Sequence, residues 1–387
     1  MTTDEQFMQR ALELARAGIG LVSPNPAVGA IVVDAAGNEA GTGTHTYEGL
    51  KHAEVLALEQ AGQRACGGTL YLNLEPCSHQ GRTAPCADVV IAAGIQRVVC
   101  SMQDPNPQVA GRGFAKLGEA GIRVEVGMFE GEARKLNESF AKYIRHRVPF
   151  VTLKAAMTLD GKIAPPPPAS QAVGPRVPAE IAAGGSTGGW ITGEIARRHV
   201  HVLRHEHDAI LAGVGTVIAD DPLLTDRSGR ARRRPLLRVI LDSWLRLPEA
   251  SRLVKSAGGD VLVLYSQADE KRKQQLEQLG LRVEKVLAHP DGRPDLHQVM
   301  LHLAKYEVTS VLIEGGATVN WNALSSGVVD KLFLFYAPKI LGEGSVPFVA
   351  SAEKGHTHVV LAARHLRLHQ FGEDFAVEGY LRDPYLE

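Results

Sequence analysis

Several features that are common in other classes of protein are missing from this sequence. Its 387 residues include only four cysteines, so a disulfide scaffold is excluded, and metal binding or burial in a reducing cytosol is favoured. No run of about 18 apolar residues occurs, so no membrane-spanning segment is expected. The N-terminal MTTDEQFMQR lacks a basic stretch followed by an apolar core, so no signal peptide is expected. These absences predict a cytoplasmic protein.

An excess of charge of one sign is also missing. The chain has 42 basic and 43 acidic residues and a formal net charge of −1. Proteins that bind nucleic acid are usually basic, and many combine basic and aromatic side chains on one surface. Because neither feature is visible in the sequence, we do not expect a nucleic-acid partner.

The length of the chain and its 44% apolar residues predict two domains with substantial cores. Segments typical of strands alternate with segments typical of helices, which indicates α/β domains with a largely parallel sheet. A helix expected at 130–147 ends at Val148–Pro149, where a second alternating series begins, so we expect domains at 1–147 and 148–387. The Pro-rich run 165–168 and the Gly- and Ala-rich stretch 169–189 are interpreted as a surface excursion without chemistry.

Two short segments combine the side chains of a catalytic zinc site. The triplet HAE at 52–54 and the stretch EPCSHQGRTAPC at 75–86 together provide His52, Cys77 and Cys86. Catalytic zinc takes three protein ligands and keeps a fourth position for water, which it acidifies toward neutrality. Cys86 follows Pro85 at an expected helix start, where the helix dipole favours a thiolate. The sequence therefore predicts one zinc ion held by these three residues.

Glu54 gives the site a candidate proton shuttle. In the middle of a helix, residues two apart point about 200° away from each other, so we expect His52 at the very start of its helix, where both side chains can face one pocket. Glu54 would then take a proton from the zinc-bound water and pass it to a leaving group. A structural zinc site is the alternative; it would recruit a fourth ligand from His79, Cys66 or Cys100, and it leaves Glu54 without a role. Otherwise Cys66 and Cys100 are expected to be small core residues.

The general zinc deaminase signature is His-x-Glu followed by Pro-Cys-x-x-Cys, whereas eight residues separate the two cysteines here. The long form PCSHQGRTAPC resembles the deaminase half of the bifunctional riboflavin-biosynthesis deaminase/reductase family. The resemblance covers nearly the whole chain in the family's order. It rests on PNPAVG at 24–29, HAEVLAL at 52–58, SMQDPNPQVAGRG at 101–113, KAAMTLDGKIA at 154–164, WITG at 190–193, GTVIADDPLLTDR at 215–227 and LIEGGATVN at 312–320.

The resemblance implies two successive reactions. A cytidine-deaminase-like three-layer domain would hydrolytically deaminate 2,5-diamino-6-ribosylamino-4(3H)-pyrimidinone 5′-phosphate and release ammonia. A dihydrofolate-reductase-like domain would then use NADPH to reduce the ribosyl group of 5-amino-6-(5-phosphoribosylamino)uracil to ribityl. It further implies that His52, Cys77 and Cys86 bind zinc and that Glu54 is the proton shuttle. We also expect a homo-oligomer, either a dimer or a tetramer.

The resemblance also implies contacts for each ligand. The predicted deaminase substrate contacts are Asn25, His79, Gln80 and Arg82. The predicted NADPH contacts are Met157, Trp190, Thr216, Asp220, Ser243, Gly316, Ala317, Thr318, Val319, Asn320, Trp321 and Asn322. The predicted reductase substrate contacts are Lys154, Asp160, Ser186, Arg204, Leu224, Arg227 and Glu314, with Arg227 and Arg204 as candidates for the phosphate. The family usually has a serine two residues before the Trp190 position; here that residue is Gly188, and Ser186 lies four before.

The residues alone support part of this assignment. In LIEGGATVN, two glycines after a strong strand allow a ligand to approach the backbone just before a helix, although a simple tight turn is the alternative. Lys154 and Asp160 fall toward the end of an expected strand, where α/β sites usually lie. Two other functions compete with a bifunctional enzyme: a nucleic-acid-editing deaminase, which the balanced charge disfavours, and a zinc-stabilised binding protein, which leaves Glu54 unexplained.

Overall fold

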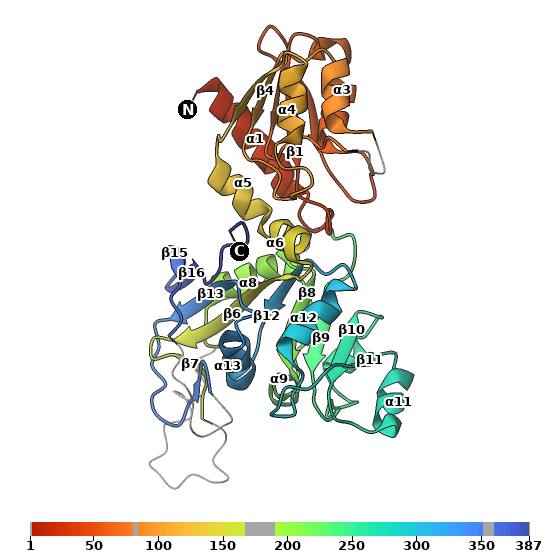
Figure 1. The fold of residues 1–387 in the computed structure, drawn as a ribbon. Helices are drawn as coiled ribbons and strands as arrows, with labels where there is room; N and C mark the ends of the chain where they lie inside the picture. Colours follow the sequence, from red (N-terminus) through yellow and green to blue (C-terminus); the bar gives the residue numbers. More distant parts are fainter. Residues whose placement is uncertain (1, 80–83, 167–189, 351–359, 387) are drawn as a thin grey trace. The chain divides into compact units, whose positions relative to one another are not determined.

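The computed structural model describes residues 2–79, 84–166, 190–350 and 360–386. The chain forms two compact units, and Figure 1 shows each as a sheet with helices on it. Unit 1 comprises Met1–Val148 with Ala231–Arg234, and unit 2 comprises Pro149–Arg230 with Pro235–Glu387. Both are mixed α/β layers, as the sequence predicted.

Unit 1 is built on a five-stranded sheet in the order β2-β1-β3-β4-β5. Strand β1 is antiparallel to β2 and β3, whereas β3, β4 and β5 run parallel. The strands are β1 (Gly29–Val33), β2 (Glu39–Thr44), β3 (Thr69–Leu72), β4 (Arg97–Cys100) and β5 (Arg123–Val126). The helices are α1 (Thr3–Ala17), α2 (Ala53–Ala61), η1 (Gly62–Ala65), α3 (Cys86–Ala92), α4 (Arg112–Glu119), α5 (Glu130–Leu136) and α6 (Glu138–His146).

Helices α1 and α2 cover opposite faces of this sheet. A capping box between Thr2 and Glu5 starts α1, whose apolar stripe includes Met8 and Ala11. These two residues pack with Ile31 of β1 in one buried cluster. Since side chains alternate along a strand, the neighbouring residues of β1 face α2 on the other side. The result is the three-layer arrangement expected for the N-terminal part of the chain.

Two glycines of β2 bring α2 unusually close to the sheet. A Cβ atom on Gly43 would lie 2.0 Å from the carbonyl oxygen of Ala53, and one on Gly41 would lie 2.2 Å from that of Ala57. Contacts below about 3 Å are not tolerated, so only glycine permits this approach. Because His52 immediately precedes α2, the close approach also fixes where His52 and Glu54 lie.

The helix expected at 130–147 is interrupted, so that prediction was wrong in detail. Asn137 separates α5 from α6 with φ −112° and ψ 14°. Its buried side chain accepts the backbone N–H of Ala27 at 2.8 Å and donates to the carbonyl oxygen of Ala27 at 3.1 Å. A long-range tertiary contact therefore outweighs the helical pattern of this segment.

Unit 2 is built on a nine-stranded sheet in the order β11-β10-β9-β8-β12-β6-β13-β16-β15. The strands from β11 to β13 in this order are parallel, and β16 and β15 add an antiparallel hairpin that the sequence reading missed. These strands are β6 (Phe150–Thr158), β8 (Ala209–Gly213), β9 (Leu237–Leu241), β10 (Val261–Tyr265), β11 (Arg282–Lys285), β12 (Ser310–Ile313), β13 (Lys331–Ala337), β15 (Arg364–Phe371) and β16 (Asp374–Tyr380). A separate two-stranded sheet pairs β7 (Lys162–Ala164) with β14 (Val346–Pro347).

Helices cover both faces of the large sheet and enclose two main apolar clusters. The helices are α8 (Glu194–Glu206), α9 (Val214–Asp220), α10 (Arg252–Lys255), α11 (Glu270–Gln278), α12 (Leu296–Ala304) and α13 (Ala317–Ser325). Strand β12 returns between β8 and β6, so the strand order reverses there, and the carboxyl ends of these strands meet at one edge. In Figure 1 that edge is marked by α9 and α13, which follow β8 and β12 directly.

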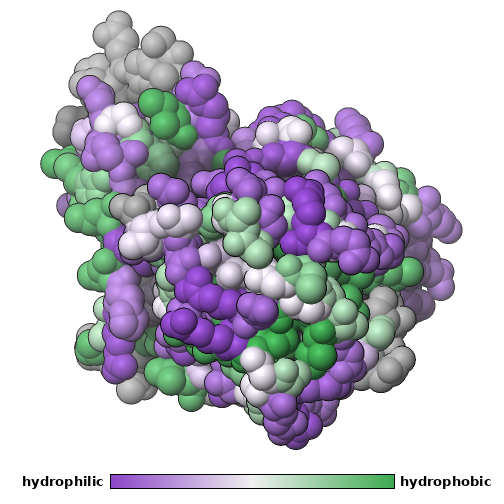
Figure 2. Space-filling model, turned by 90° about the horizontal axis from the view of Figure 1, so that it is seen from above, coloured by the Kyte–Doolittle hydropathy of each residue, from purple (hydrophilic) through white to green (hydrophobic). Residues whose placement is uncertain are grey.

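The surface shows no unusual grouping of one residue kind in the view of Figure 2. Hydrophilic side chains cover much of that face, and hydrophobic ones lie in smaller groups between them. Within the described residues, none of the helices combines the length and the apolar character that a membrane crossing requires.

Candidate active sites of the two units

In unit 1 the predicted zinc ligands lie together. His52 Nδ1 is 3.1 Å from Cys86 Sγ and 3.6 Å from Cys77 Sγ, and the three ligand atoms lie within 4.8 Å of one another. Tetrahedral zinc with bonds of about 2.0–2.3 Å separates its ligand atoms by roughly 3.5–3.8 Å. One imidazole and two thiols at these distances therefore fit a zinc ion with three protein ligands.

Helix ends place two of these ligands. His52 is the N-cap of α2 in an extended conformation, φ −75° and ψ 161°, which confirms that it begins the helix. Cys86 is the first residue of α3, and its backbone N–H donates to Cys77 Sγ at 3.3 Å. Hydrogen bonds from Cys86 and His52 lower the pKa of the Cys77 thiol, which favours the thiolate form that a metal ligand needs.

Glu54 lies on the first turn of α2 and is almost fully buried, with 3% of its surface exposed. Burial raises the pKa of this carboxyl above its ordinary value, although the charge of His52 opposes the shift. A carboxyl whose pKa is raised toward neutrality can both accept and release a proton under working conditions. The structure thus gives Glu54 the environment of an acid–base group.

Asn25 is oriented by His45, a buried residue that the sequence reading did not select. His45 Nδ1 bonds the carbonyl oxygen of Lys51 at 2.9 Å, and its Nε2 bonds Asn25 Nδ2 at 3.0 Å. Burial lowers the pKa of His45, which favours the neutral ring. Nδ1 then carries the proton, Nε2 accepts from Asn25, and the amide oxygen of Asn25 is left for another partner. Nothing in the local pattern THTYEG indicated this role.

Glu75 organises the loops next to Cys77 and was also missed. Its buried carboxylate accepts four backbone N–H groups: those of Asp104 at 3.1 Å and Gly111 at 2.9 Å on Oε2, and those of Gly113 at 2.8 Å and Phe114 at 3.4 Å on Oε1. The motif SMQDPNPQVAGRG therefore wraps around this carboxylate. Burial, together with the charge of Glu75, also raises the pKa of Asp104 to about 7.

The remaining predictions for unit 1 have mixed outcomes. His79 is described and exposed, whereas Gln80 and Arg82 lie outside the described residues. Cys66 is exposed, so its expected place in the core was wrong, and Cys100 is buried as expected. Among the residues that the structure describes, His79, Cys66 and Cys100 do not join the metal-ligand group, which supports the three-ligand interpretation.

In unit 2 three predicted substrate contacts form one buried charge cluster. Arg204 of α8 binds Glu314 through two hydrogen bonds, of 2.7 and 3.0 Å, and Lys154 Nζ lies 3.5 Å from the same carboxylate. Burial favours the neutral form of Glu314, but the charges of Arg204 and Lys154 outweigh it and lower its pKa to about 2. Burial lowers the pKa of Lys154. Glu314 directly follows β12, so this cluster lies at the strand-order reversal.

The predicted cofactor loop has the shape of a cradle. Gly316 is the N-cap of α13, and a Cβ atom on Gly316 would have Thr216 Oγ1 of α9 as its nearest neighbour, at 3.8 Å. By contrast, a Cβ atom on Gly315 would lie 2.7 Å from Val319. Backbone N–H groups at a helix start and an open approach at Gly316 suit a phosphate group. The residues present therefore fit a dinucleotide cofactor.

Other predicted reductase residues are distributed around this edge. Met157 is buried and Trp190 is exposed, with Arg197 stacked 5.0 Å from the Trp190 ring. Asp160 is occupied within the structure, because it accepts from Thr158 Oγ1 and from the backbone of Leu341 and Gly342.

The remaining predicted reductase residues lie on α9, on α13 or outside the described residues. Asp220 ends α9 and is exposed. Asn320 is fully buried and donates to the carbonyl oxygen of Phe348, which gives it a structural contact. The other residues of the predicted loop lie on α13: Ala317, Thr318, Val319, Trp321 and Asn322. Ser186 lies outside the described residues.

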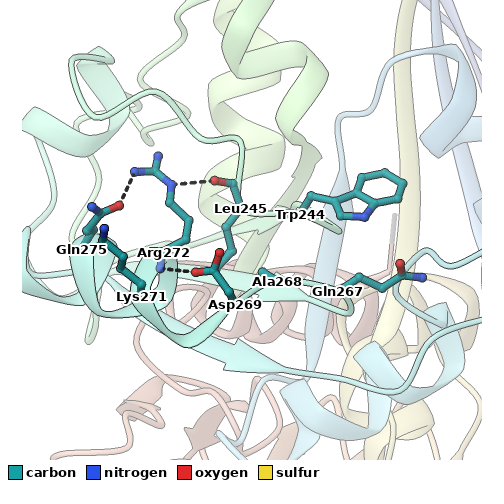
Figure 3. Close-up of a pocket in the computed structure, with 8 residues that line it drawn as sticks. All are labelled: Trp244, Leu245, Gln267, Ala268, Asp269, Lys271, Arg272 and Gln275. Carbon is teal, nitrogen blue, oxygen red and sulfur yellow. Dashed lines mark hydrogen bonds between the residues drawn. The ribbon is translucent and has the colours of Figure 1, made fainter.

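A hollow of about 620 Å³ lies beside Ser243 at the carboxyl ends of β9 and β10. Figure 3 shows Trp244 and Gln267 on one side and Lys271 and Arg272 on the other. The Trp244 side chain is 51% exposed, and Lys271 is exposed as well. Arg272 instead holds the wall, since it donates to the carbonyl oxygens of Leu245 and Leu247. The hollow lies at the same edge of the sheet as the predicted cofactor loop, because β9 and β10 follow β12 and β8 in the strand order.

Both units match known protein families. Residues 1–102 match the family described as the cytidine and deoxycytidylate deaminase zinc-binding region. Residues 149–377 match the RibD C-terminal domain. The first match lies in the N-terminal part of the chain and the second in the C-terminal part.

Curated and solved relatives cover almost the whole chain. The riboflavin biosynthesis protein RibD of Aquifex aeolicus is 40% identical over 341 residues, which are 88% of each chain. That of Escherichia coli is 40% identical over 350 residues, 88% of this chain and 89% of the relative. The solved RibD of Acinetobacter baumannii has a TM-score of 0.79 at 34% identity and covers 98% of both chains. A diaminohydroxyphosphoribosylaminopyrimidine deaminase/5-amino-6-(5-phosphoribosylamino)uracil reductase of Thermotoga maritima has a TM-score of 0.76 at 35% identity, again over 98% of both chains.

Proposed function

The chain belongs to the RibD family of riboflavin-biosynthesis proteins, and from this membership we propose which of its residues perform the family's two reactions. It is a bifunctional enzyme. A zinc-dependent deaminase acts on 2,5-diamino-6-ribosylamino-4(3H)-pyrimidinone 5′-phosphate, and an NADPH-dependent reductase converts 5-amino-6-(5-phosphoribosylamino)uracil to the ribitylamino product. We assign deamination to residues 1–147 and reduction to residues 148–387.

The observation that carries the deaminase assignment is the buried carboxyl of Glu54 beside a three-ligand thiol–imidazole group. His52, Cys77 and Cys86 would hold the zinc ion, which would act as a Lewis acid that favours the ionisation of water. Glu54 accepts the proton of the attacking water and delivers it to the departing amine. The raised pKa of Glu54 supports both halves of this transfer.

Substrate orientation in the deaminase is assigned to a second set of residues. Asn25 presents its amide oxygen to the pyrimidine, because its nitrogen is committed to His45. His79, Gln80 and Arg82 contact the substrate from the segment between the two cysteine ligands. An arginine there suits the phosphate that the substrate carries.

The test of the deaminase assignment uses two variants of the same helix. Glu54→Gln removes the proton carrier, whereas Glu59→Gln changes an exposed residue of α2 that pairs with Lys51. We expect ammonia release to fall by about 10²–10⁴-fold in the first variant and to remain unchanged in the second. Zinc content and reductase activity should be normal in both. Full ammonia release by Glu54→Gln with bound zinc would refute the proton-shuttle assignment.

In the reductase, NADPH supplies a hydride when bound. We propose that Gly316 and the start of α13 hold its phosphates, together with Thr216 and Asp220 of α9. The same assignment includes Ala317, Thr318, Val319, Trp321 and Asn322 along α13, and Met157 and Trp190 beside the nicotinamide. Asn320 is also assigned to the NADPH-binding loop, where its side-chain amide donates to the carbonyl oxygen of Phe348.

The adenosine end is assigned to the hollow beside Ser243. An extended dinucleotide that starts at α13 and α9 continues along the carboxyl ends of β9 and β10. The exposed Trp244 ring offers a stacking surface for adenine, and Lys271 offers a positive charge for the 2′-phosphate that distinguishes NADPH from NADH.

The phosphoribosyl substrate is assigned to the charge cluster and the segment after α9. Lys154 and Glu314 contact the ribosyl group, and we assign Asp160 and Ser186 to the same contact. Leu224 and Arg227 lie along the substrate, and Arg227 binds its phosphate. Arg204, a second phosphate candidate, also orders the cluster, because it binds both Glu314 and the carbonyl oxygen of Thr225.

The reductase assignment is tested in the bifunctional chain itself, where ammonia release by the deaminase serves as the control. Glu314→Gln should abolish NADPH oxidation with the deaminated substrate, since Arg204 and Lys154 lose their shared counter-ion, while ammonia release stays normal. NADPH oxidation should appear only after deamination. Equal oxidation with the undeaminated substrate would overturn the order of the two reactions.

Two further proposals concern the whole molecule. We infer a cytoplasmic enzyme, since Cys77 and Cys86 must stay reduced to bind metal. We also infer a homo-oligomer, either a dimer or a tetramer, because Leu366 and Leu368 are 60% and 76% exposed on β15, the outer strand of the large sheet. Light scattering of the purified chain measures the assembly directly, and a monomer at micromolar concentration would exclude it.

A further inference from the structure

One face of α8 holds the segment that carries the phosphate-binding candidate Arg227. Three successive residues of this segment are each bound by a residue of the helix. Arg204 Nη1 donates to the carbonyl oxygen of Thr225 at 2.9 Å, and His205 Nδ1 lies 3.2 Å from Asp226 Oδ2. The backbone N–H of Arg227 donates to His201 Nδ1 at 3.3 Å.

The three helix residues act as a unit because of their spacing. Residues 201, 204 and 205 are three and four positions apart, so their side chains leave α8 on the same side. The segment itself has an unusual backbone, since Leu224 is buried and has φ 55°, in the left-handed region. A conformation of this kind persists only when surrounding contacts hold it.

We propose that His201 is a positioning residue of the reductase: by accepting the backbone N–H of Arg227 it holds the Arg227 guanidinium at the phosphate of the substrate. This inference rests on the proposed function of Arg227. No contact of His201 with the substrate is required, so its effect should appear in substrate binding and not in the chemical step. Its Nδ1 must stay unprotonated, which places the ring proton on Nε2.

The surroundings of His201 favour that neutral form. Arg204 and His205 lie on its own helix, Arg227 and Asp226 on the segment, and Glu314 at the end of β12. Burial and the positive charges of Arg204 and Arg227 lower the pKa of His201, and the charges of Glu314 and Asp226 only partly oppose them. The hydrogen bond is therefore present at neutral pH and is lost as the pH falls through the lowered pKa.

Three substitutions separate positioning from direct substrate contact. Asparagine at this position keeps an acceptor near the place of Nδ1, glutamine reaches toward the place of Nε2, and alanine keeps neither. We expect His201→Ala to raise KM for the phosphorylated substrate about two- to tenfold, the value of one hydrogen bond. Both kcat and KM for NADPH should stay within twofold of wild type. His201→Asn should restore KM, and His201→Gln should not.

A substrate without its phosphate, the pH dependence of KM and ¹⁵N spectra provide three further measurements. With the substrate lacking its 5′-phosphate, His201→Ala and wild type should have equal KM values. Below about pH 6.5, the ordinary pKa of histidine, KM of the wild type should rise more steeply than that of His201→Asn, which responds only to the phosphate of the substrate itself. In ¹⁵N spectra at pH 7.5, the signal that His201→Asn removes should be that of an unprotonated Nδ1.

Each contrary result has a definite meaning. Recovery by His201→Gln alone shows direct contact through Nε2 and overturns positioning, as does a wild-type KM in His201→Ala. Arg227→Ala is the reference variant. If it raises KM for the phosphorylated substrate while the His201 variants do not, only the His201 inference fails. If Arg227→Ala has a wild-type KM, the proposed role of Arg227 fails, and the inference fails with it. Thermal unfolding of each variant identifies any general loss of folding.

Discussion

The replacement of Glu75 by glutamine tests how the loops beside the candidate zinc ligand Cys77 are held in place. The carboxylate of Glu75 accepts four backbone N–H groups, two on each oxygen, and 3% of the residue is exposed. In glutamine one oxygen becomes an NH₂ group, which cannot accept. Two N–H donors then lose their acceptor, and the new amide hydrogens face them directly.

The magnitude follows from those two lost bonds. A hydrogen bond to a charged group contributes about 1.5–3 kcal/mol to stability. Two such bonds at the lower value give about 3 kcal/mol, a large part of the roughly 5–15 kcal/mol that stabilises a domain. For a domain of about 150 residues, 1 kcal/mol moves the unfolding midpoint by about 2–4 °C. We therefore expect the transition of the N-terminal unit to fall by about 6–12 °C.

Differential scanning calorimetry measures this shift. We expect the two compact units to unfold in separate transitions, and NADPH, as the reductase cofactor, should raise the midpoint of unit 2 alone. Glu59→Gln is the matched control, since its carboxylate is exposed and pairs with Lys51 on the surface. Zinc affinity should also fall in Glu75→Gln, because Cys77 lies two residues away. An unfolding midpoint equal to that of Glu59→Gln would refute the reasoning.

Five other substitutions have expected outcomes. Gly43→Ala places a Cβ atom 2.0 Å from Ala53 O and should cost at least about 1–3 kcal/mol in urea unfolding, whereas Gly118→Ala, which meets nothing within 4 Å, should stabilise α4 by about 0.5–1 kcal/mol. The pKa of Asp104 is raised to about 7, so the folded state keeps a proton that the unfolded chain releases near pH 4. Between these pH values the free energy of unfolding of the wild type should fall by about 1.4 kcal/mol per pH unit relative to that of Asp104→Asn. Parallel curves of unfolding free energy against pH would contradict the assignment. Trp244→Ala removes the proposed stacking surface for adenine and should raise KM for NADPH roughly fivefold or more. Lys271→Ala should raise KM for NADPH but not for NADH, because only NADPH carries the 2′-phosphate. Equal effects on both cofactors would contradict the assignment of Lys271 to the 2′-phosphate.

Much of the metal site could be predicted from local sequence. The spacing of HAE requires His52 to begin its helix if His52 and Glu54 are to share a pocket, and the structure confirms that placement. Pro85 likewise marked the start of α3 at Cys86. These inferences succeed because helix geometry and capping depend on residues only a few positions apart.

The residues that were missed depend on contacts between distant parts of the chain. His45 acquires its role through Asn25, and Glu75 through backbone groups 29 to 39 positions away. Asn137 interrupts a helical pattern because it binds Ala27, 110 positions earlier. The antiparallel pair β15 and β16 was missed as well, since β15 is largely exposed and lacks an apolar pattern.

The sequence by itself thus determined the α/β class of each unit, the choice of His52, Cys77 and Cys86 as candidate zinc ligands, and the position of Glu54 beside them. The class and the helix start follow from local patterns, and the candidate ligands follow from residue types that few other roles explain. Only the tertiary structure decided how the sites are held. Glycines of β2 admit α2 to the sheet, Glu75 gathers four N–H groups beside Cys77, and α8 binds the Arg227 segment through His201, Arg204 and His205. A buried polar group must form hydrogen bonds, and here its partners lie in segments that only the folded chain brings together. A local sequence pattern therefore cannot identify those partners.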